Sequence, residues 1–134
     1  MVEKRPKVGL GVIVVKDGKI LLHQRNYGYQ KNSWALPGGH LEFKESFEDC
    51  AARETEEESE VKIKNVRFAA VTNDWFKEDH YITVFMIANW ESGEPKVMEP
   101  DKCNEWRWVK WDKMPQPVFL PLKNLIEQGY NPFS

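Results

Sequence analysis

The sequence predicts one α/β or α+β layered domain built around a mixed β-sheet. The patterns along the chain run in the order of two strands, a helix, several strands and a final helix, which is the order of such layered folds. A length of 134 residues suits one domain, and 41% apolar residues supply its core. Because no repeat or linker-like tract divides the chain, we expect a single domain over residues 1–134.

The N-terminal third predicts a hairpin followed by loops. Residues 8–15 are apolar and β-branched, and they meet a second apolar run, 20–24, across Asp17-Gly18. Asp-Gly between two such runs is a strong hairpin signal. Residues 26–33 are polar and indicate a loop, and Pro, Gly and Gly within residues 34–39 predict irregular backbone.

The remaining two thirds predict a helix, further strands and a short closing helix. Residues 46–59 lack Pro and Gly and are rich in Glu and Ala, which favours a helix. Strand-like patterns follow, then a loop, a short strand and a helix that Pro121 begins and Gly129 ends. The expected strands cover 61–71, 81–88 and 106–111, the expected loop 91–105, and the expected helix 122–128.

Composition excludes several classes of protein. Apolar runs such as residues 12–15 are far too short for a membrane span, and the polar start has no signal-peptide core, so we expect a cytoplasmic protein without membrane contact. Cys50 and Cys103 have no metal-like spacing and are expected to be reduced and buried. The net charge of −2 hides a segment, residues 42–60, with nine acids and two bases.

That segment contains the central functional signal. With each helical residue placed at about 100° per step, an apolar stripe begins the helix and carboxylates continue it. The apolar members are Phe47, Cys50 and Ala51, and the acidic members are Glu54, Glu57 and Glu58. Acidic runs are usually solvated faces, but a solvated face would lie opposite the apolar stripe.

Three carboxylates on a partly buried face repel one another unless a cation lies among them. Oxygen ligands suit Mg²⁺, or Mn²⁺ in its place, better than Zn²⁺. Since Mg²⁺ often binds substrate phosphates as well, a polyphosphate partner is indicated. Gly38-Gly39, just upstream, allows a backbone to approach a ligand closely.

These residues resemble the Nudix box of the Nudix hydrolases. The resemblance rests on Gly39, five residues, Glu45, seven residues, and then Arg53-Glu54-Thr55-Glu56-Glu57-Glu58-Ser59-Glu60-Val61. Residues 36–43, 99–103 and 128–133 are similar to the MutT-type branch of that family. The resemblance implies a Nudix fold, an α/β/α sandwich around a mixed β-sheet.

The same resemblance implies a Mg²⁺-dependent hydrolase that converts nucleoside triphosphates, including modified ones such as 8-oxo-dGTP, to the monophosphate and pyrophosphate. The alternatives are a pyrophosphatase for ADP-ribose or nucleotide sugars and a non-catalytic nucleotide-binding module. Because no basic stripe or nucleic-acid motif is present, we expect a small nucleotide as partner and no nucleic-acid polymer. A homodimer is expected from the family alone.

Residue roles are carried over from the family position by position. Metal ligands would be Glu54, Glu57, Glu58 and the Gly38 carbonyl, with Glu54 also acting on the attacking water. Arg53 would hold the glutamates in register through hydrogen bonds, and Glu45 would pair with Arg53 or support the loop. Glu99 and Asp101 are both open candidates for a further ligand.

Substrate contacts are expected from Gly38, Gly39, His40, Arg25, Phe119 and Leu120. For Arg25 a surface position is equally favoured, while His40 is expected in the site rather than packed in the loop. Residues 119–122 either line a base pocket or simply begin the last helix. The aromatic group Trp75, Phe76, His80 and Tyr81 is expected in a loop, first as an interface and second as a base-stacking surface.

Two positions depart from the family pattern. Thr55 replaces an aliphatic residue and should be tolerated at some desolvation cost. Glu60 replaces a glycine that usually ends the helix in a left-handed conformation, where another residue costs about 1 kcal/mol. We therefore expect an altered helix exit with intact chemistry.

Overall fold

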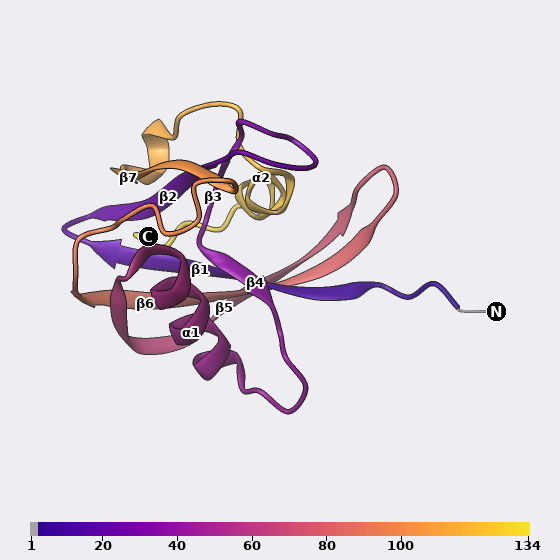
Figure 1. Cartoon of the computed structure of the whole chain (residues 1–134), viewed down its shortest axis with the longest axis horizontal. Coiled ribbons are helices and arrows are strands. Elements are labelled where there is room, and N and C mark those ends of the chain that lie inside the picture. The colour runs from indigo at the N-terminus through magenta and orange to yellow at the C-terminus, as the bar shows by residue number, and fades with distance from the viewer. Residues whose placement is uncertain (1–2) are drawn as a thin grey trace.

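The computed structural model describes residues 3–134 and contains a seven-stranded mixed sheet with two α-helices (Figure 1). The main strand order is β3-β2-β1-β6-β5, while β4 pairs with β1 and β7 pairs with β2. Along the chain the elements are β1 (Lys7–Lys16), β2 (Lys19–Arg25), β3 (Trp34–Ala35), β4 (Gly38–His40), α1 (Phe47–Ser59), β5 (Lys62–Trp75), β6 (His80–Ser92), β7 (Cys103–Val109), a 3₁₀ turn (Trp111–Lys113) and α2 (Leu120–Glu127).

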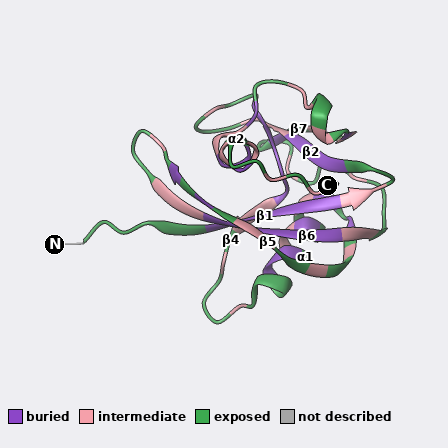
Figure 2. Ribbon diagram, turned by 180° about the vertical axis from the view of Figure 1, so that it is seen from behind, coloured by how far each residue is buried: buried purple, intermediate pink, exposed green. Residues whose placement is uncertain are grey.

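The two helices cover opposite faces of this sheet, which confirms the predicted sandwich (Figures 1 and 2). Alternate residues of β1 point to opposite faces, as the period of a strand requires. Val12 and Val14 pack with Cys50 and Ala51 of α1, while Ile13 packs in the second core with α2. Both cores are fully buried, so one continuous sheet fixes the position of both helices.

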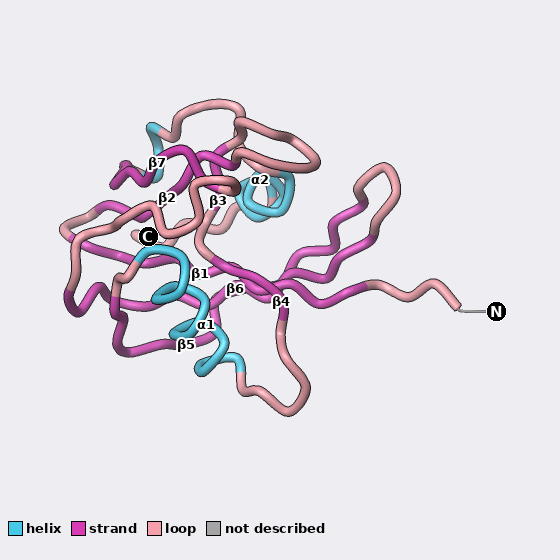
Figure 3. Tube along the Cα trace, viewed as in Figure 1, coloured by secondary structure: helices cyan, strands magenta, loops and turns pink. Residues whose placement is uncertain are grey.

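The predicted β1–β2 hairpin is confirmed. Lys16 pairs with Lys19 across Asp17-Gly18, whose φ angles of 51° and 75° are the left-handed values a tight hairpin turn requires. β1 also pairs in parallel with β6 over nine residue pairs. This parallel pairing links β1 to the long β5–β6 hairpin that projects from the body of the molecule (Figure 3).

The prediction of irregular backbone over residues 34–39 is wrong, because the short strands β3 and β4 lie there. Gly38 and Gly39 pair with Gly11 and Leu10 of β1. A Cβ at Gly38 would collide with the Leu10 carbonyl. Glycine therefore permits this close pairing instead of preventing regular structure.

Several element ends also differ from the predictions. β5 and β6 pair as far as Trp75 and His80. Of the aromatic group expected in a loop, only Phe76 therefore lies in the loop, while Trp75, His80 and Tyr81 lie in strands. β7 begins at Cys103, which shortens the expected loop 91–105, and α2 begins at Leu120 because a proline fits the first helical turn. Among residues 3–134 no helix is long and apolar enough to cross a membrane. Both cysteines are buried and unpaired.

Helix α1 has clear end signals. The Ser46 side chain accepts a hydrogen bond from the Asp49 amide at 3.0 Å and caps the N-terminus. At the other end Glu60 itself takes the left-handed conformation, with φ 64° and ψ 10°. The prediction of an altered exit is therefore wrong: the helix ends in the geometry typical of glycine, and Glu60 accepts the strain.

Candidate active site

The buried face of α1 differs from the predicted stripe. Its buried members are Cys50, Ala51, Thr55 and Ser59, whereas Phe47 is 38% exposed. Burial of two small polar residues is possible because Ser59 Oγ donates to the Thr55 carbonyl at 2.7 Å. Thr55 Oγ1, by contrast, is buried without a partner among the described residues, which is the expected desolvation cost. The face thus remains free of charge along its centre.

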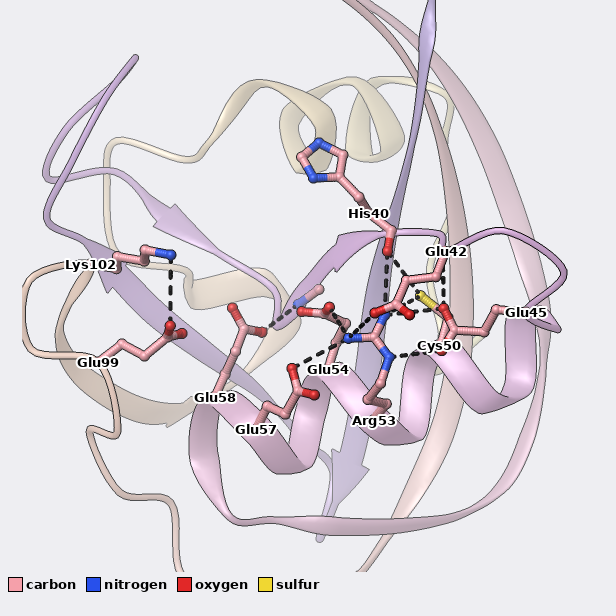
Figure 4. A network of polar contacts seen from close by, with 11 residues as sticks. His40, Glu42, Glu45, Cys50, Arg53, Glu54, Glu57, Glu58, Glu99 and Lys102 are labelled. Carbon is pink, nitrogen blue, oxygen red and sulfur yellow. Dashed lines mark hydrogen bonds and ion pairs between the residues drawn. The ribbon is translucent and has the colours of Figure 1, made fainter.

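The three predicted carboxylates lie along the flank of that face and differ in exposure. The Glu54 side chain is 15% exposed and the Glu57 side chain is 58% exposed, so Glu57 lies outside the partly buried set. Glu58 is half-buried and lies next to Gly38. The three carboxylates therefore differ in exposure although they project from the same side of α1 (Figure 4).

Glu58 is short of hydrogen-bond donors. The hydrogen bond that its side chain accepts comes from the Gly38 amide at 2.8 Å. Burial, and then repulsion from Glu54, Glu99 and Glu57, raises the pKa of Glu58 to about 8 against the effect of that one donor. Burial likewise raises the pKa of Glu54.

Arg53 gathers the other acids of the flank (Figure 4). Its Nε and Nη2 donate to Glu45 at 2.7 and 3.1 Å in a bidentate pair, and its Nη1 donates to Glu54 at 2.7 Å and to Glu57 at 3.3 Å. The Arg53 hydrogen bonds lower the pKa of Glu45 to about 2. These contacts match the positions expected for Arg53 and Glu45, and they do not extend to Glu58.

Two glycines bring the β4 strand against this flank. A Cβ at Gly39 would overlap the Glu54 carboxylate, so that carboxylate lies directly on the backbone. Gly38, as described above, must approach Leu10 just as closely. The close approach at both positions explains why the Gly38 amide reaches Glu58.

No group of three or more His, Cys, Asp or Glu side chains within residues 3–134 is already arranged around one metal position. Arg53 pairs with both Glu54 and Glu57, at 2.7 and 3.3 Å, and so holds these two carboxylates beside its guanidinium. The donor set still fits a hard divalent cation, since it consists of carboxylate oxygens and Glu58 forms no ion pair among residues 3–134.

Of the two further acidic candidates, Glu99 lies nearer to this flank. A cavity of about 20 Å³ is lined by both Glu58 and Glu99, and Asp101 is not part of its lining. Glu99 also contributes to the raised pKa of Glu58. Lys102 lies 3.7 Å from Glu99 and partly balances its charge.

A pocket of about 650 Å³ opens beside Glu58. Five of the six predicted substrate residues line it, namely Gly38, Gly39, His40, Arg25 and Phe119. Leu120 does not, and its amide instead donates to Gln30 Oε1 at 2.7 Å, because Leu120 opens α2 while Pro121 and Leu122 face the pocket. The pocket volume lies within the range of nucleotide-sized ligands.

Arg25 is part of this pocket wall rather than a free surface base. Its guanidinium lies 4.0 Å from the Phe119 ring and 4.7 Å from the Tyr27 ring, distances typical of cation–π contacts. It also donates to the Tyr27 and Tyr29 carbonyls at 3.3 and 3.1 Å. Arg25 thereby fixes the loop after β2 over the pocket.

The tip of the β5–β6 hairpin completes the wall. Phe76 lies 5.0 Å from Tyr29 and 5.8 Å from both Phe119 and Tyr81, measured between ring centres. Tyr81 OH lies 2.9 Å from His40 Nε2. The aromatic group is thus divided: Phe76 and Tyr81 line the pocket, while Trp75 is 73% exposed.

Sequence reasoning missed His23 and Thr83, which lie in the pocket floor. His23 is 8% exposed, and its Nδ1 has no partner among the described residues. Burial and then the charge of Arg25 lower the pKa of His23 to about 4, so the ring is neutral at pH 7. A His or Thr inside a strand pattern gives no functional signal, because only the pairing of distant strands places it in a pocket.

Comparison with known proteins agrees with this geometry. A model of the NUDIX domain matches residues 5–128. A solved MutT NUDIX hydrolase from Burkholderia pseudomallei is 32% identical with a TM-score of 0.87, over 93% of this chain and 98% of that one. The NUDIX domain of Shewanella oneidensis NrtR, solved with ADP ribose, shares the fold at 20% identity and a TM-score of 0.77, over 95% and 88% of the two chains.

Curated relatives include the NAD-capped RNA hydrolase NudC of Edwardsiella ictaluri, 30% identical over 91% of this chain and 48% of that protein. The chain thus spans about half the length of the curated relatives it matches. The family model covers nearly all of the chain, and the sandwich, the glycine pair and the acidic flank of α1 agree with it. The chain therefore belongs to the NUDIX family of hydrolases.

Proposed function

We propose that this chain is a Mg²⁺-dependent nucleoside triphosphate pyrophosphohydrolase that acts on modified nucleotides such as 8-oxo-dGTP. One observation carries the proposal: Glu58, a carboxylate that forms no ion pair among residues 3–134, lies on the boundary between the acidic flank and a nucleotide-sized pocket. A polyphosphate with its cation fits this boundary, because the cation would satisfy Glu58 and the phosphates together.

In this proposal Glu54, Glu57, Glu58 and the Gly38 carbonyl hold the cation, and Glu99 joins them from the small cavity beside Glu58. Mn²⁺ can take the place of Mg²⁺, since the ligands are all oxygen atoms. When bound, the cation neutralises phosphate charge and lowers the pKa of a coordinated water. Arg53 keeps Glu54 and Glu57 in place, and Glu45 keeps Arg53 in place.

The reaction adds water across the anhydride between the α and β phosphorus atoms, which yields the nucleoside monophosphate and pyrophosphate. Glu54 accepts the water proton, and its burial favours the protonated product because burial raises its pKa. His40, oriented by Tyr81, faces the phosphates, while Arg25 and Phe119 hold the base side of the pocket. Positioning and electrostatics then supply most of the rate enhancement.

A second candidate is hydrolysis of a dinucleotide pyrophosphate, as found in NAD, ADP-ribose or an NAD-capped RNA. It is favoured by the relatives named NAD-capped RNA hydrolase, one of which is 30% identical over most of this chain. Because the names of these relatives include an RNA substrate, the expectation that no nucleic-acid polymer binds needs a direct test. A capped RNA therefore belongs in the substrate panel.

The test is a substrate panel with Mg²⁺ in which pyrophosphate, phosphate and nucleoside monophosphate are measured separately. It includes unmodified and 8-oxo nucleoside triphosphates, ADP-ribose, a nucleotide sugar, NAD and an NAD-capped RNA. Pyrophosphate release from triphosphates at the highest kcat/KM supports the proposal. Higher kcat/KM for a dinucleotide establishes the second candidate, and binding without turnover of any compound establishes a non-catalytic module.

We also propose that the protein is a homodimer. The edge strand β5 exposes Val71 and Trp75, at 44% and 73%. Exposed apolar side chains on an edge strand favour association. Sedimentation of the wild type and of Trp75→Lys measures this, and a wild type that sediments as a monomer at micromolar concentration contradicts it.

A further inference from the structure

A second buried carboxylate lies behind the pocket floor. Asp74 of β5 is completely buried, and its Oδ2 accepts hydrogen bonds from Thr72 Oγ1 at 3.0 Å and from Thr83 Oγ1. Its Oδ1 accepts a hydrogen bond from Asn124 Nδ2 of α2 at 2.8 Å. Asp74 thus ties together three elements, β5, β6 and α2.

These contacts fix the direction of the Thr83 hydroxyl. A carboxylate only accepts hydrogen bonds, and a hydroxyl has one proton and two lone pairs. Since Thr83 Oγ1 donates its proton to Asp74, only its lone pairs remain for any other neighbour. Thr83 lines the pocket, whereas Asp74 does not. Thr83 therefore presents a hydrogen-bond acceptor to the pocket, because Asp74 takes up the proton of its hydroxyl group.

The surroundings of Thr83 make that polarity matter. The neighbouring floor and wall residues Leu36, Phe85 and Leu122 are apolar and line the same pocket. In such an apolar pocket a ligand N–H can donate a hydrogen bond to Thr83 Oγ1. A ligand carbonyl oxygen or bare ring nitrogen cannot, because it is an acceptor facing another acceptor. A wrongly paired polar group in an apolar site typically lowers binding by about 10-fold or more.

We propose that Thr83 accepts a hydrogen bond from an N–H group of the bound nucleobase, and that Asp74 is the positioning residue that enforces this direction. The inference rests on the proposed function only in placing a base in this pocket. The preferred substrates are then nucleotides whose base directs an amino group or a ring N–H toward Thr83. An 8-oxopurine is one such base, because it has an N–H at the position where an unmodified purine has a bare nitrogen.

The test compares kcat/KM within pairs of triphosphates in which one member carries an N–H donor that the other lacks: 8-oxo-dGTP with dGTP, which differ in the N7–H, and dGTP with dITP, which differ in the 2-amino group. The wild type is expected to prefer the donor member of at least one pair by about 10-fold or more. Asp74→Asn keeps the shape but donates its amide to Thr83, so the Thr83 proton turns toward the pocket. The preference should then fall about 10-fold or reverse, and Thr83→Val should bring it close to one.

Thr72→Val is the matched control, because it removes another donor to the same Asp74 oxygen without touching the pocket lining. It should lower the melting temperature and leave the preference unchanged. The inference is overturned if Thr83→Val keeps the wild-type preference, if Thr72→Val shifts it as much as Asp74→Asn does, or if the wild type shows no preference in any pair.

Binding of the corresponding monophosphates, followed by tryptophan fluorescence, separates this inference from the proposed function. A donor preference in binding that Asp74→Asn removes supports the inference even if no triphosphate is hydrolysed, in which case the proposed function alone fails. Pyrophosphate release with identical preferences in the wild type, Asp74→Asn and Thr83→Val rejects the inference alone.

Discussion

Glu58 and Asp74 are two carboxylates drawn away from solvent in the same small domain, and their surroundings are opposite. Asp74 accepts hydrogen bonds from three side chains of three elements. Within residues 3–134 Glu58 accepts one, from a backbone amide, and the charges of nearby acids raise its pKa further. Burial alone therefore does not define a role: a carboxylate with a full set of donors holds the fold and directs a neighbour, whereas one short of donors is available for a cation.

The largest expected effect is a loss of activity when the charge of Glu58 is removed. Glu58→Gln keeps the shape but removes the charge that binds the cation, so kcat/KM should fall by about 10³-fold, equivalent to several kcal/mol of lost stabilisation. Steady-state pyrophosphate release measures it. Glu56→Gln, an exposed position on the same helix, is the control and should retain wild-type rates. Near-normal turnover of Glu58→Gln contradicts the proposed metal role.

The next effect concerns pH and metal. The folded pKa of Glu58 is raised from 4.5 to about 8, so its favourable contribution to stability is complete below pH 4.5 and is lost as pH rises to about 8. In EDTA the free energy of unfolding should therefore fall across this window by a few kcal/mol. Mg²⁺ should restore stability at pH 8, because it favours the charged form.

Denaturant unfolding at a series of pH values, with EDTA or Mg²⁺, checks this expectation. Glu58→Gln should lose both the decline with pH and most of the gain from Mg²⁺. If the free energy of unfolding of the wild type does not change from pH 5 to 8 in EDTA, then the charged form of Glu58 is stabilised by more than the hydrogen bond from the Gly38 amide, and the expectation is contradicted.

On the Asp74 side the sign of the stability effect reverses. Asp74→Ala leaves the Thr72, Thr83 and Asn124 donors without their acceptor, and unfolding should become easier by about 2 to 3 kcal/mol. Glu58→Gln at pH 8 in EDTA should instead be at least as stable as the wild type. Urea unfolding of both variants under one buffer tests the contrast, which fails if the two changes have the same sign.

The smallest effect is expected at Glu60, an acid with neither role. Its side chain pairs with Lys96 at 3.2 Å on the surface, while its backbone has φ 64°. Glu60→Gly relieves the left-handed strain and should raise the free energy of unfolding by about 1 kcal/mol or less. Activity should not change, since the carboxylates of the flank keep their positions. A loss of stability shows that the ion pair outweighs the strain.

Much of the fold followed from local patterns. The Asp17-Gly18 hairpin, the helix over residues 46–59 and the order of the elements apart from β3 and β4 were predicted, because turn chemistry and periodicity act over a few residues. The errors were also local in origin. Gly38 and Gly39 were taken as breakers, although their missing side chains are what allow β4 to pair with β1.

The candidate site divides in the same way. Spacing along the helix placed Glu54, Glu57 and Glu58 on one side, and helix geometry makes that result independent of the rest of the chain. Their different exposures were not predictable, since these depend on where the sheet and β4 cover the helix. Leu120 was wrongly expected at the pocket, because the choice among consecutive residues depends on how α2 is seated.

The sequence by itself predicted an acidic helix whose carboxylates suit a cation, the hairpin and the layered domain, since each depends on residues close together in the chain. Only the tertiary structure decided that the Gly38 amide donates to Glu58 and that Arg25 and Phe76 line one pocket. It also decided that the Thr83 hydroxyl donates to Asp74. The physical reason is strand register. These partners lie on different elements and loops, and the pairing of β1, β5 and β6 sets which side chains meet.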